Sequence, residues 1–135
     1  NANRVQEWAV VRSEDMTPRA AYFAAQYVST ILDDVRGVHN IRPEVIGDAP
    51  ADLLIKAFRN GKGETLIALW RTSPTDDSCQ PVPVSLHIPK IKAQSAELLD
   101  LVYGSSQPAK VEPTNGSLIV HNILVADWPV VLKVK

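Results

Sequence analysis

Few residues in this chain have the types and spacing that chemistry requires. His39, His87 and His121 are the only histidines, and none has a second histidine, a cysteine or a carboxylate at metal-ligand spacing. No serine stands in a nucleophile-elbow pattern, and the single cysteine, Cys79, cannot form an internal disulfide. The sequence therefore predicts no catalytic residue, no bound metal and no cofactor, and a chain that is not itself an enzyme.

Two acidic pairs and one glycine-rich segment are the remaining motifs that could bind an ion or a phosphate. Asp33-Asp34 and Asp76-Asp77 could offer oxygen ligands to calcium, but neither has the spacing of an EF-hand loop. Residues 60–63 (NGKG) precede no predicted helix, whereas a phosphate-binding loop needs a helix N-terminus. We expect a hairpin turn at this position.

Aromatic side chains offer the clearest binding chemistry. An exposed indole can stack on the apolar face of a sugar ring. The candidates for contact with carbohydrate or with a protein partner are Trp128, Trp8 and Tyr103, and Trp128, between an aspartate and a proline, is the first candidate for exposure. Trp70 lies in a run that is apolar on both sides, so we expect it to pack in the core.

A long amphipathic helix is predicted over residues 17–36, and one side of it must be buried. Its apolar stripe recurs every three or four residues and consists of Ala20, Phe23, Ala24, Tyr27, Val28, Ile31 and Val35. The opposite side is polar, with Arg19, Gln26, Asp33 and Arg36. Thr17 is a suitable N-cap, and Pro18 suits the first helical position. Gly37 is expected to end the helix in the left-handed conformation.

The rest of the chain predicts strands and polar turns. Residues 52–59 and 64–71 flank the NGKG turn and should pair as a hairpin. In the second of these strands, Leu66, Ala68 and Trp70 point to one side and Ile67 and Leu69 to the other. Both sides are apolar, so we expect this strand to be central in its sheet.

Further strands are predicted before and after this hairpin. They lie at residues 5–11, 82–88, 96–103, 110–112, 117–125 and 130–135. Pro83 favours a sheet edge for the strand at residues 82–88. The pattern predicts a mainly β fold, an antiparallel β-sandwich of Greek-key or jelly-roll type with about seven to eight strands, over residues 42–135. Residues 1–41 would hold the N-terminal strand and the one long α-helix.

Composition limits the partners. The chain has 135 residues, with 14 basic against 15 acidic side chains and a net charge of -1, so no broad positive field favours nucleic acid. No apolar run approaches the roughly 20 residues that span a bilayer. We expect no nucleic-acid partner and no membrane partner.

Several segments, taken in order, resemble the C-terminal end of a retaining glycoside hydrolase of the large TIM-barrel clan. They are residues 7–34 (EWAVVRSEDMTPRAAYFAAQYVSTILDD), 66–71 (LIALWR), 96–104 (AELLDLVYG) and 126–134 (ADWPVVLKV). In that family the last barrel helix opens with a proline and an Ala-Tyr pair, matched by Pro18, Ala21 and Tyr22. A small β-sandwich follows, whose conserved positions are matched by Leu69-Trp70, Asp100 with Gly104, and Asp127-Trp128-Pro129.

The resemblance also implies what this chain lacks. Retaining enzymes of this clan use two carboxylates on barrel strands four and seven, and neither strand can be assigned within these 135 residues. The expected function is therefore a non-catalytic C-terminal β-sandwich module or fragment with an accessory role. Its helix face would complete a barrel or cover the sandwich, and the expected partners are a glycosidase barrel domain or a second copy that associates through the helix face.

A second function from another class stays open. A free-standing module could bind carbohydrate or a protein partner through its exposed aromatic side chains, or through the unpaired edge of the strand predicted at residues 5–11. Solvent exposure of Trp128 and Trp8 separates the two readings, because a purely structural module has no need of an exposed indole.

Overall fold

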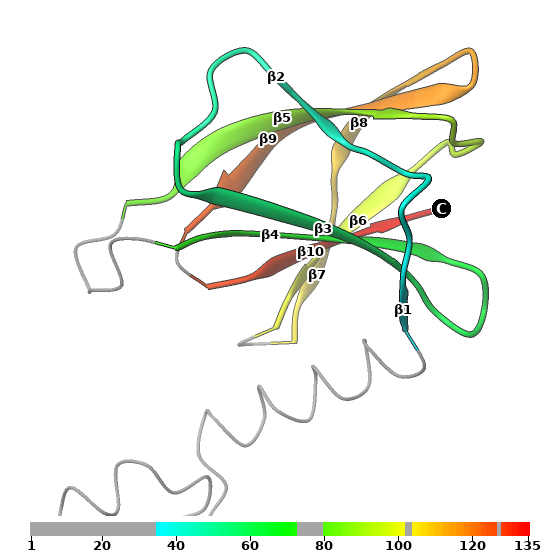
Figure 1. Cartoon of the computed structure of the whole chain (residues 1–135), viewed down its shortest axis with the longest axis horizontal. Coiled ribbons are helices and arrows are strands. Elements are labelled where there is room, and N and C mark those ends of the chain that lie inside the picture. The colour runs from blue at the N-terminus through cyan, green and yellow to red at the C-terminus, as the bar shows by residue number, and fades with distance from the viewer. Residues whose placement is uncertain (1–34, 73–79, 102–103, 127) are drawn as a thin grey trace, which may run out of the picture.

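The computed structural model describes residues 35–72, 80–101, 104–126 and 128–135. Within these ranges the chain is mainly β and forms two antiparallel sheets, one above the other (Figure 1). The predicted mainly β, two-sheet architecture is confirmed. The predicted strand at residues 5–11 and the predicted helix up to residue 34 lie outside the described residues, as do Trp8, Cys79 and Tyr103.

The larger sheet has six strands in the order β1-β3-β4-β10-β6-β7, and every neighbouring pair is antiparallel. Their bounds are Arg36–Gly37 for β1, Leu53–Arg59 for β3, Thr65–Arg71 for β4, Val130–Val134 for β10, Ala96–Asp100 for β6 and Ser106–Pro108 for β7.

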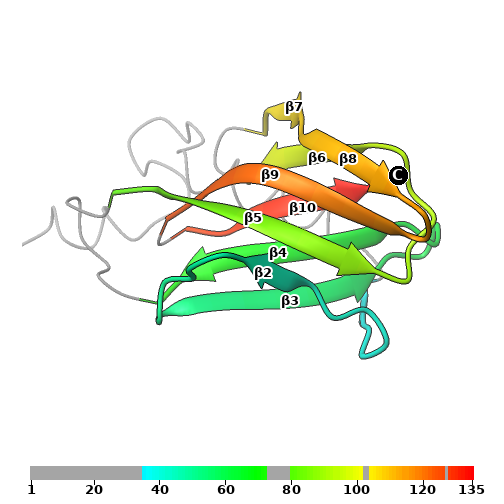
Figure 2. The same cartoon turned by 90° about the horizontal axis from the view of Figure 1, so that it is seen from above.

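The smaller sheet has four strands in the order β2-β5-β9-β8, again antiparallel, and lies in front of the larger one in Figure 2. Their bounds are Glu44–Ile46 for β2, Val82–Pro89 for β5, Ser117–Val125 for β9 and Lys110–Thr114 for β8.

Seven of these strands correspond to the seven predicted from residue 52 onwards, and the short strands β1, β2 and β7 are additional. The edge position predicted from Pro83 is wrong, because β5 lies between β2 and β9. The strand tolerates this proline because β2 pairs only with residues 85–87 of β5. The missing N–H of Pro83 therefore falls where β2 does not pair.

The predicted hairpin is present, with β3 and β4 in register from Leu53↔Arg71 to Arg59↔Thr65. Asn60 organises its turn. The Asn60 Oδ1 accepts hydrogen bonds from the N–H groups of Lys62 (3.0 Å) and Glu64 (2.9 Å). Gly63 has a φ of 79°, a conformation that side chains disfavour. The sequence NGKG therefore acts as a turn, as predicted.

The main core lies between the two sheets and is built by alternation along the strands. Buried aliphatic side chains come from the central strands: Ile67 and Leu69 of β4, Val84, Leu86 and Ile88 of β5, Leu118, Val120, Ile123 and Val125 of β9, and Leu132 and Val134 of β10. The alternation in β9 shifts by one residue between Val120 and Ile123. Asn122 there has a φ of 54°, and its N–H donates to Ser85 Oγ at 3.1 Å. This β-bulge keeps both halves of β9 facing the core.

A second apolar cluster lies on the opposite face of the six-stranded sheet, which we call the outer face. The outer-face cluster consists of the buried Leu66, Ala68, Leu101 and Val131, with the partly buried Val35, Phe58, Trp70 and Leu99 packed against it. The predicted two-sided apolar character of β4 and its central position are both confirmed. Trp70 packs in this cluster rather than between the sheets.

The predicted end of the helix is wrong at Gly37. Gly37 is absent from the positive-φ glycines of the described residues, so it provides no left-handed stop. Instead, Arg36 and Gly37 already form β1 and pair with Arg59 and Phe58 at the edge of the six-stranded sheet. A few residues further on, Ile41 is buried in the core between the sheets.

Candidate functional site

One end of the sandwich gathers the features expected of a carbohydrate contact. At this end β4, β6 and β9 finish and β3, β5 and β10 begin. Trp128 lies there, in the short segment between β9 and β10, and is 47% exposed. The exposure predicted for Trp128 is confirmed. Trp8 and Tyr103 lie outside the described residues.

A hollow of about 360 Å³ opens beside Trp128. Its lining combines apolar side chains with a carboxylate, two hydroxyls and an amide: Pro81, Leu98, Leu99, Asp100, Ser105, Ser106, Gln107, Leu124, Trp128, Pro129 and Val130. Leu124 is 62% exposed although it stands between the fully buried Ile123 and Val125. The volume falls at the lower end of the range for small-ligand sites.

Backbone hydrogen bonds fix the polar side of the hollow. The Asp100 N–H donates to the Ser105 carbonyl oxygen at 2.8 Å, and the Gly104 N–H donates to the Asp100 carbonyl oxygen at 2.8 Å. Gly104 has a φ of 68°, which explains the glycine at this position. These bonds bring Asp100, at the end of β6, next to Ser105, and β7 continues the wall with Ser106 and Gln107.

The segment that leads to Trp128 is tied to the β3–β4 hairpin. The Arg71 N–H donates to the carbonyl oxygen of Ala126 at 2.7 Å. The Arg71 Nε lies 3.2 Å from both carboxylate oxygens of Asp52, and both side chains are mostly buried. The backbone bond and the ion pair together link the segment before Trp128 to both strands of this hairpin. Sequence reasoning missed this pair because its residues lie 19 apart.

The lining offers surfaces for both stacking and hydrogen bonding. An indole and an exposed leucine offer an apolar surface, while Asp100, Ser105 and Gln107 could exchange hydrogen bonds with hydroxyl groups. Asp100 is the one ionisable residue in the described part of the lining.

Two histidine–carboxylate pairs form on the four-stranded sheet, away from this hollow. His87 Nδ1 lies 3.4 Å from Glu44 Oε2, and His121 Nε2 lies 2.6 Å from Glu112 Oε2. Sequence spacing does not predict these pairs, because strand pairing brings the partners together: Glu44 lies directly opposite His87. In the part of the chain that the structure describes, no three His, Cys, Asp or Glu side chains gather as a metal site.

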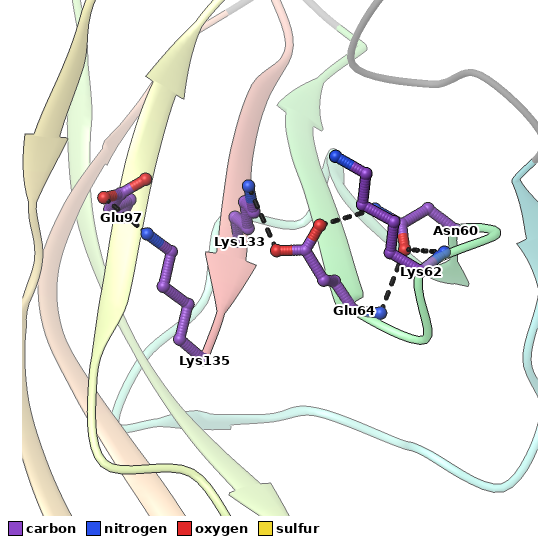
Figure 3. Close-up of polar contacts among 6 residues, drawn as sticks. All are labelled: Asn60, Lys62, Glu64, Glu97, Lys133 and Lys135. Carbon is purple, nitrogen blue, oxygen red and sulfur yellow. Dashed lines mark hydrogen bonds and ion pairs between the residues drawn. The ribbon is translucent and has the colours of Figure 1, made fainter.

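The electrostatic surroundings of Glu64 shift its pKa. The hydrogen bond from Asn60 Nδ2 to Glu64 Oε1 (3.0 Å), and then the contact with Lys133 Nζ at 3.1 Å, lower the pKa of Glu64 below its usual value. Figure 3 shows Glu64 between these two partners. The group joins the hairpin turn to β10, at the end of the sandwich opposite the hollow.

No protein-family profile matches the chain, and no curated protein matches it significantly. Within the described ranges, no helix is long and apolar enough to cross a membrane. The class that the fold and the hollow define is a two-sheet antiparallel β protein with an exposed indole at one end.

Proposed function

We propose that this chain is a non-catalytic β-sandwich module that accompanies a glycoside hydrolase and contacts carbohydrate in the hollow beside Trp128. The observation that carries the proposal is the half-exposed Trp128 indole in a hollow with both apolar and hydrogen-bonding walls. A sugar ring has one apolar face and a rim of hydroxyl groups, so it needs both kinds of wall at once.

The geometry sets the strength of such a contact. A tryptophan side chain offers about 200 Å² of contact area, and roughly half of that is accessible at Trp128. Covering about 100 Å² of apolar surface contributes about 2.5 kcal/mol. Loss of translational and rotational freedom offsets much of the total binding energy, so we expect dissociation constants of about a millimolar.

The test is a titration with a panel of soluble oligosaccharides of different linkage. Tryptophan fluorescence measures binding to the parent chain, and calorimetry measures binding to the variants. Trp128→Ala should weaken binding by about tenfold or more, and Trp128→Phe should weaken it less. Ile46→Ala is the matched control, because Ile46 is 46% exposed but lies on β2 and does not line the hollow. The proposal would be contradicted if no oligosaccharide of the panel bound, or if Trp128→Ala and Ile46→Ala lowered the affinity equally.

A second candidate is a purely structural module packed beside a glycosidase barrel. The outer-face cluster favours it, because this cluster gives the sandwich a second apolar packing surface at the point where the N-terminal segment enters. The coding sequence upstream of Asn1 tests this candidate. An in-frame barrel with glutamates at the ends of its fourth and seventh strands is expected, and an upstream sequence without any barrel pattern would refute the association with a hydrolase.

A further inference from the structure

Two side chains near the centre of the outer face are buried as deeply as the core between the sheets. Leu66 of β4 and Val131 of β10 are each 1% exposed. Side chains on one face of a sheet stand away from the strands, so neighbouring strands alone do not bury them this completely. Burial this complete is typical of side chains that a further layer covers, beyond the two sheets.

The described strands do not supply that layer. Within the ranges that the structure describes, the residues packed against the outer-face cluster come from β3, β4, β6 and β10 of the same sheet and from the residue that follows β6. The exception is Val35, which immediately precedes β1. The four-stranded sheet packs on the other face, through Ile67 and Leu69.

We propose that the apolar stripe of residues 17–34 packs in cis on the outer-face cluster and forms the third layer of the sandwich. Val35 carries this assignment, because it is the last position of the stripe predicted from sequence and it contacts the cluster. The stripe of Ala20, Phe23, Tyr27 and Ile31 continues from Val35 at helical spacing. The inference requires neither sugar binding nor a barrel domain.

The dimensions of the two surfaces agree. From Ala20 to Val35 a helix extends about 22 Å, at 1.5 Å per residue. The cluster extends from Phe58 on β3 to Leu101 beyond β6, which lie three strand spacings apart, or about 14 Å. Displacement along the strands adds about 13 Å, so the diagonal is about 19 Å. Ala68, the smallest side chain of the cluster, lets a helix approach β4 closely.

Charged residues set one limit of the apolar surface. Glu64 pairs with Lys133 at 3.1 Å, and Lys135 pairs with Glu97 at 2.8 Å (Figure 3). Lys133 stands directly opposite both Leu66 and Glu97, so the ion pairs border the cluster at the edge nearest the β3–β4 turn. From Val35, apolar side chains of the cluster continue away from this edge, towards Leu101.

The test uses the full chain and substitutions on the two sides of the predicted helix. Phe23→Ser and Tyr27→Ser should each lower the folding equilibrium constant at least tenfold in urea unfolding, whereas Gln26→Ser, on the polar side, should change it less than twofold. Ile31→Val keeps the chain folded and should lower the constant about threefold to tenfold. The double variant Tyr27→Ser with Val131→Ala should lose less unfolding free energy than the two single variants lose together, because the two side chains share contacts.

Sedimentation separates the cis arrangement from its main competitor. The proposal expects one chain of 14.8 kDa at every concentration, for the parent and for Gln26→Ser. A concentration-dependent dimer that Phe23→Ser dissociates would show that a second copy covers the face, as self-association through the helix predicts, and would overturn the proposal. Stripe substitutions that leave unfolding unchanged would overturn it too, because another segment would then cover Leu66 and Val131.

Discussion

Leu66 and Leu69 form a matched pair that tests whether the outer face is a true second core. Both are leucines of the same central strand, one on each face, and their exposed fractions are 1% and 0%. Replacing a fully buried leucine by alanine costs about 2.7 to 5 kcal/mol, because both transfer energy and cavity formation count. We therefore expect Leu66→Ala and Leu69→Ala to lower the free energy of unfolding by similar amounts, about 3 kcal/mol each.

The assay is equilibrium unfolding in urea, followed by circular dichroism and by fluorescence to verify a single transition. With a urea dependence of about 2 kcal/mol per molar, each variant should shift the midpoint by about 1.5 M without changing the slope. Leu54→Ala is the control on the outer face. Leu54 lies opposite Trp70 on β3 and is 38% exposed, so its loss should cost about 1 kcal/mol or less.

A small effect of Leu66→Ala would refute the reasoning. If Leu66→Ala costs less than about 1 kcal/mol while Leu69→Ala costs about 3 kcal/mol, the outer face is an ordinary solvated sheet face. The third layer inferred above would then have nothing to cover. Equal costs, by contrast, require a layer over Leu66 in solution.

Two further predictions concern the turns. The folded pKa of Glu64 lies below its usual value of about 4.5, so its ionised form stabilises the fold above that pH, and this contribution is lost as the pH falls through the lower, folded pKa. Glu64→Gln should therefore flatten this part of the curve of unfolding free energy against pH. An unchanged curve would contradict the role of Asn60 and Lys133. Gly116→Ala should destabilise by about 1 to 2 kcal/mol, since Gly116 has a φ of 82°, whereas Gly37→Ala should be neutral or stabilising by up to about 1 kcal/mol. Urea unfolding distinguishes these outcomes. A large loss of stability in Gly37→Ala would indicate that Gly37 does adopt the left-handed conformation predicted from sequence.

Local patterns predict the parts of this fold that depend on neighbours in sequence. The β3–β4 hairpin follows from a turn in which Asn60 and Gly63 are the residues that its conformation favours. The alternation of Leu66 and Ile67 predicts a strand with two apolar faces, and each face holds its own cluster. In both cases the controlling interactions span only a few residues.

Features that depend on distant pairing are not encoded in any local pattern. β1 is two residues long and exists because Arg36 and Gly37 meet β3, so no periodicity could predict it. The same holds for His87 and Glu44, which are 43 residues apart and become neighbours when β2 adds to β5. Gly37 illustrates the resulting error, because a glycine after a helical stripe predicts a left-handed stop unless the chain is already pairing as a strand.

The candidate site was predictable only in part for the same reason. A tryptophan between an aspartate and a proline, at the junction of two strands, favours exposure, and Trp128 is exposed. The hollow beside it draws on five separate stretches of sequence, from Pro81 to Val130. Its polar wall arises when the turn after β6 brings Ser105 to Asp100.

The hollow and the outer face meet at one residue. Leu99 lines the hollow beside Trp128 and also packs against the outer-face cluster, while Leu98, its neighbour on β6, packs against the core between the sheets. Leu99 therefore links the outer-face cluster to the wall of the proposed sugar contact, and a substitution of Leu66 or Val131 can alter binding without touching the ligand. The two proposals need controls from different places: Ile46 on β2 for the sugar contact and Gln26 on the polar side of the stripe for the third layer. A change in affinity or stability supports a function for either surface only where it exceeds the change in the matching control.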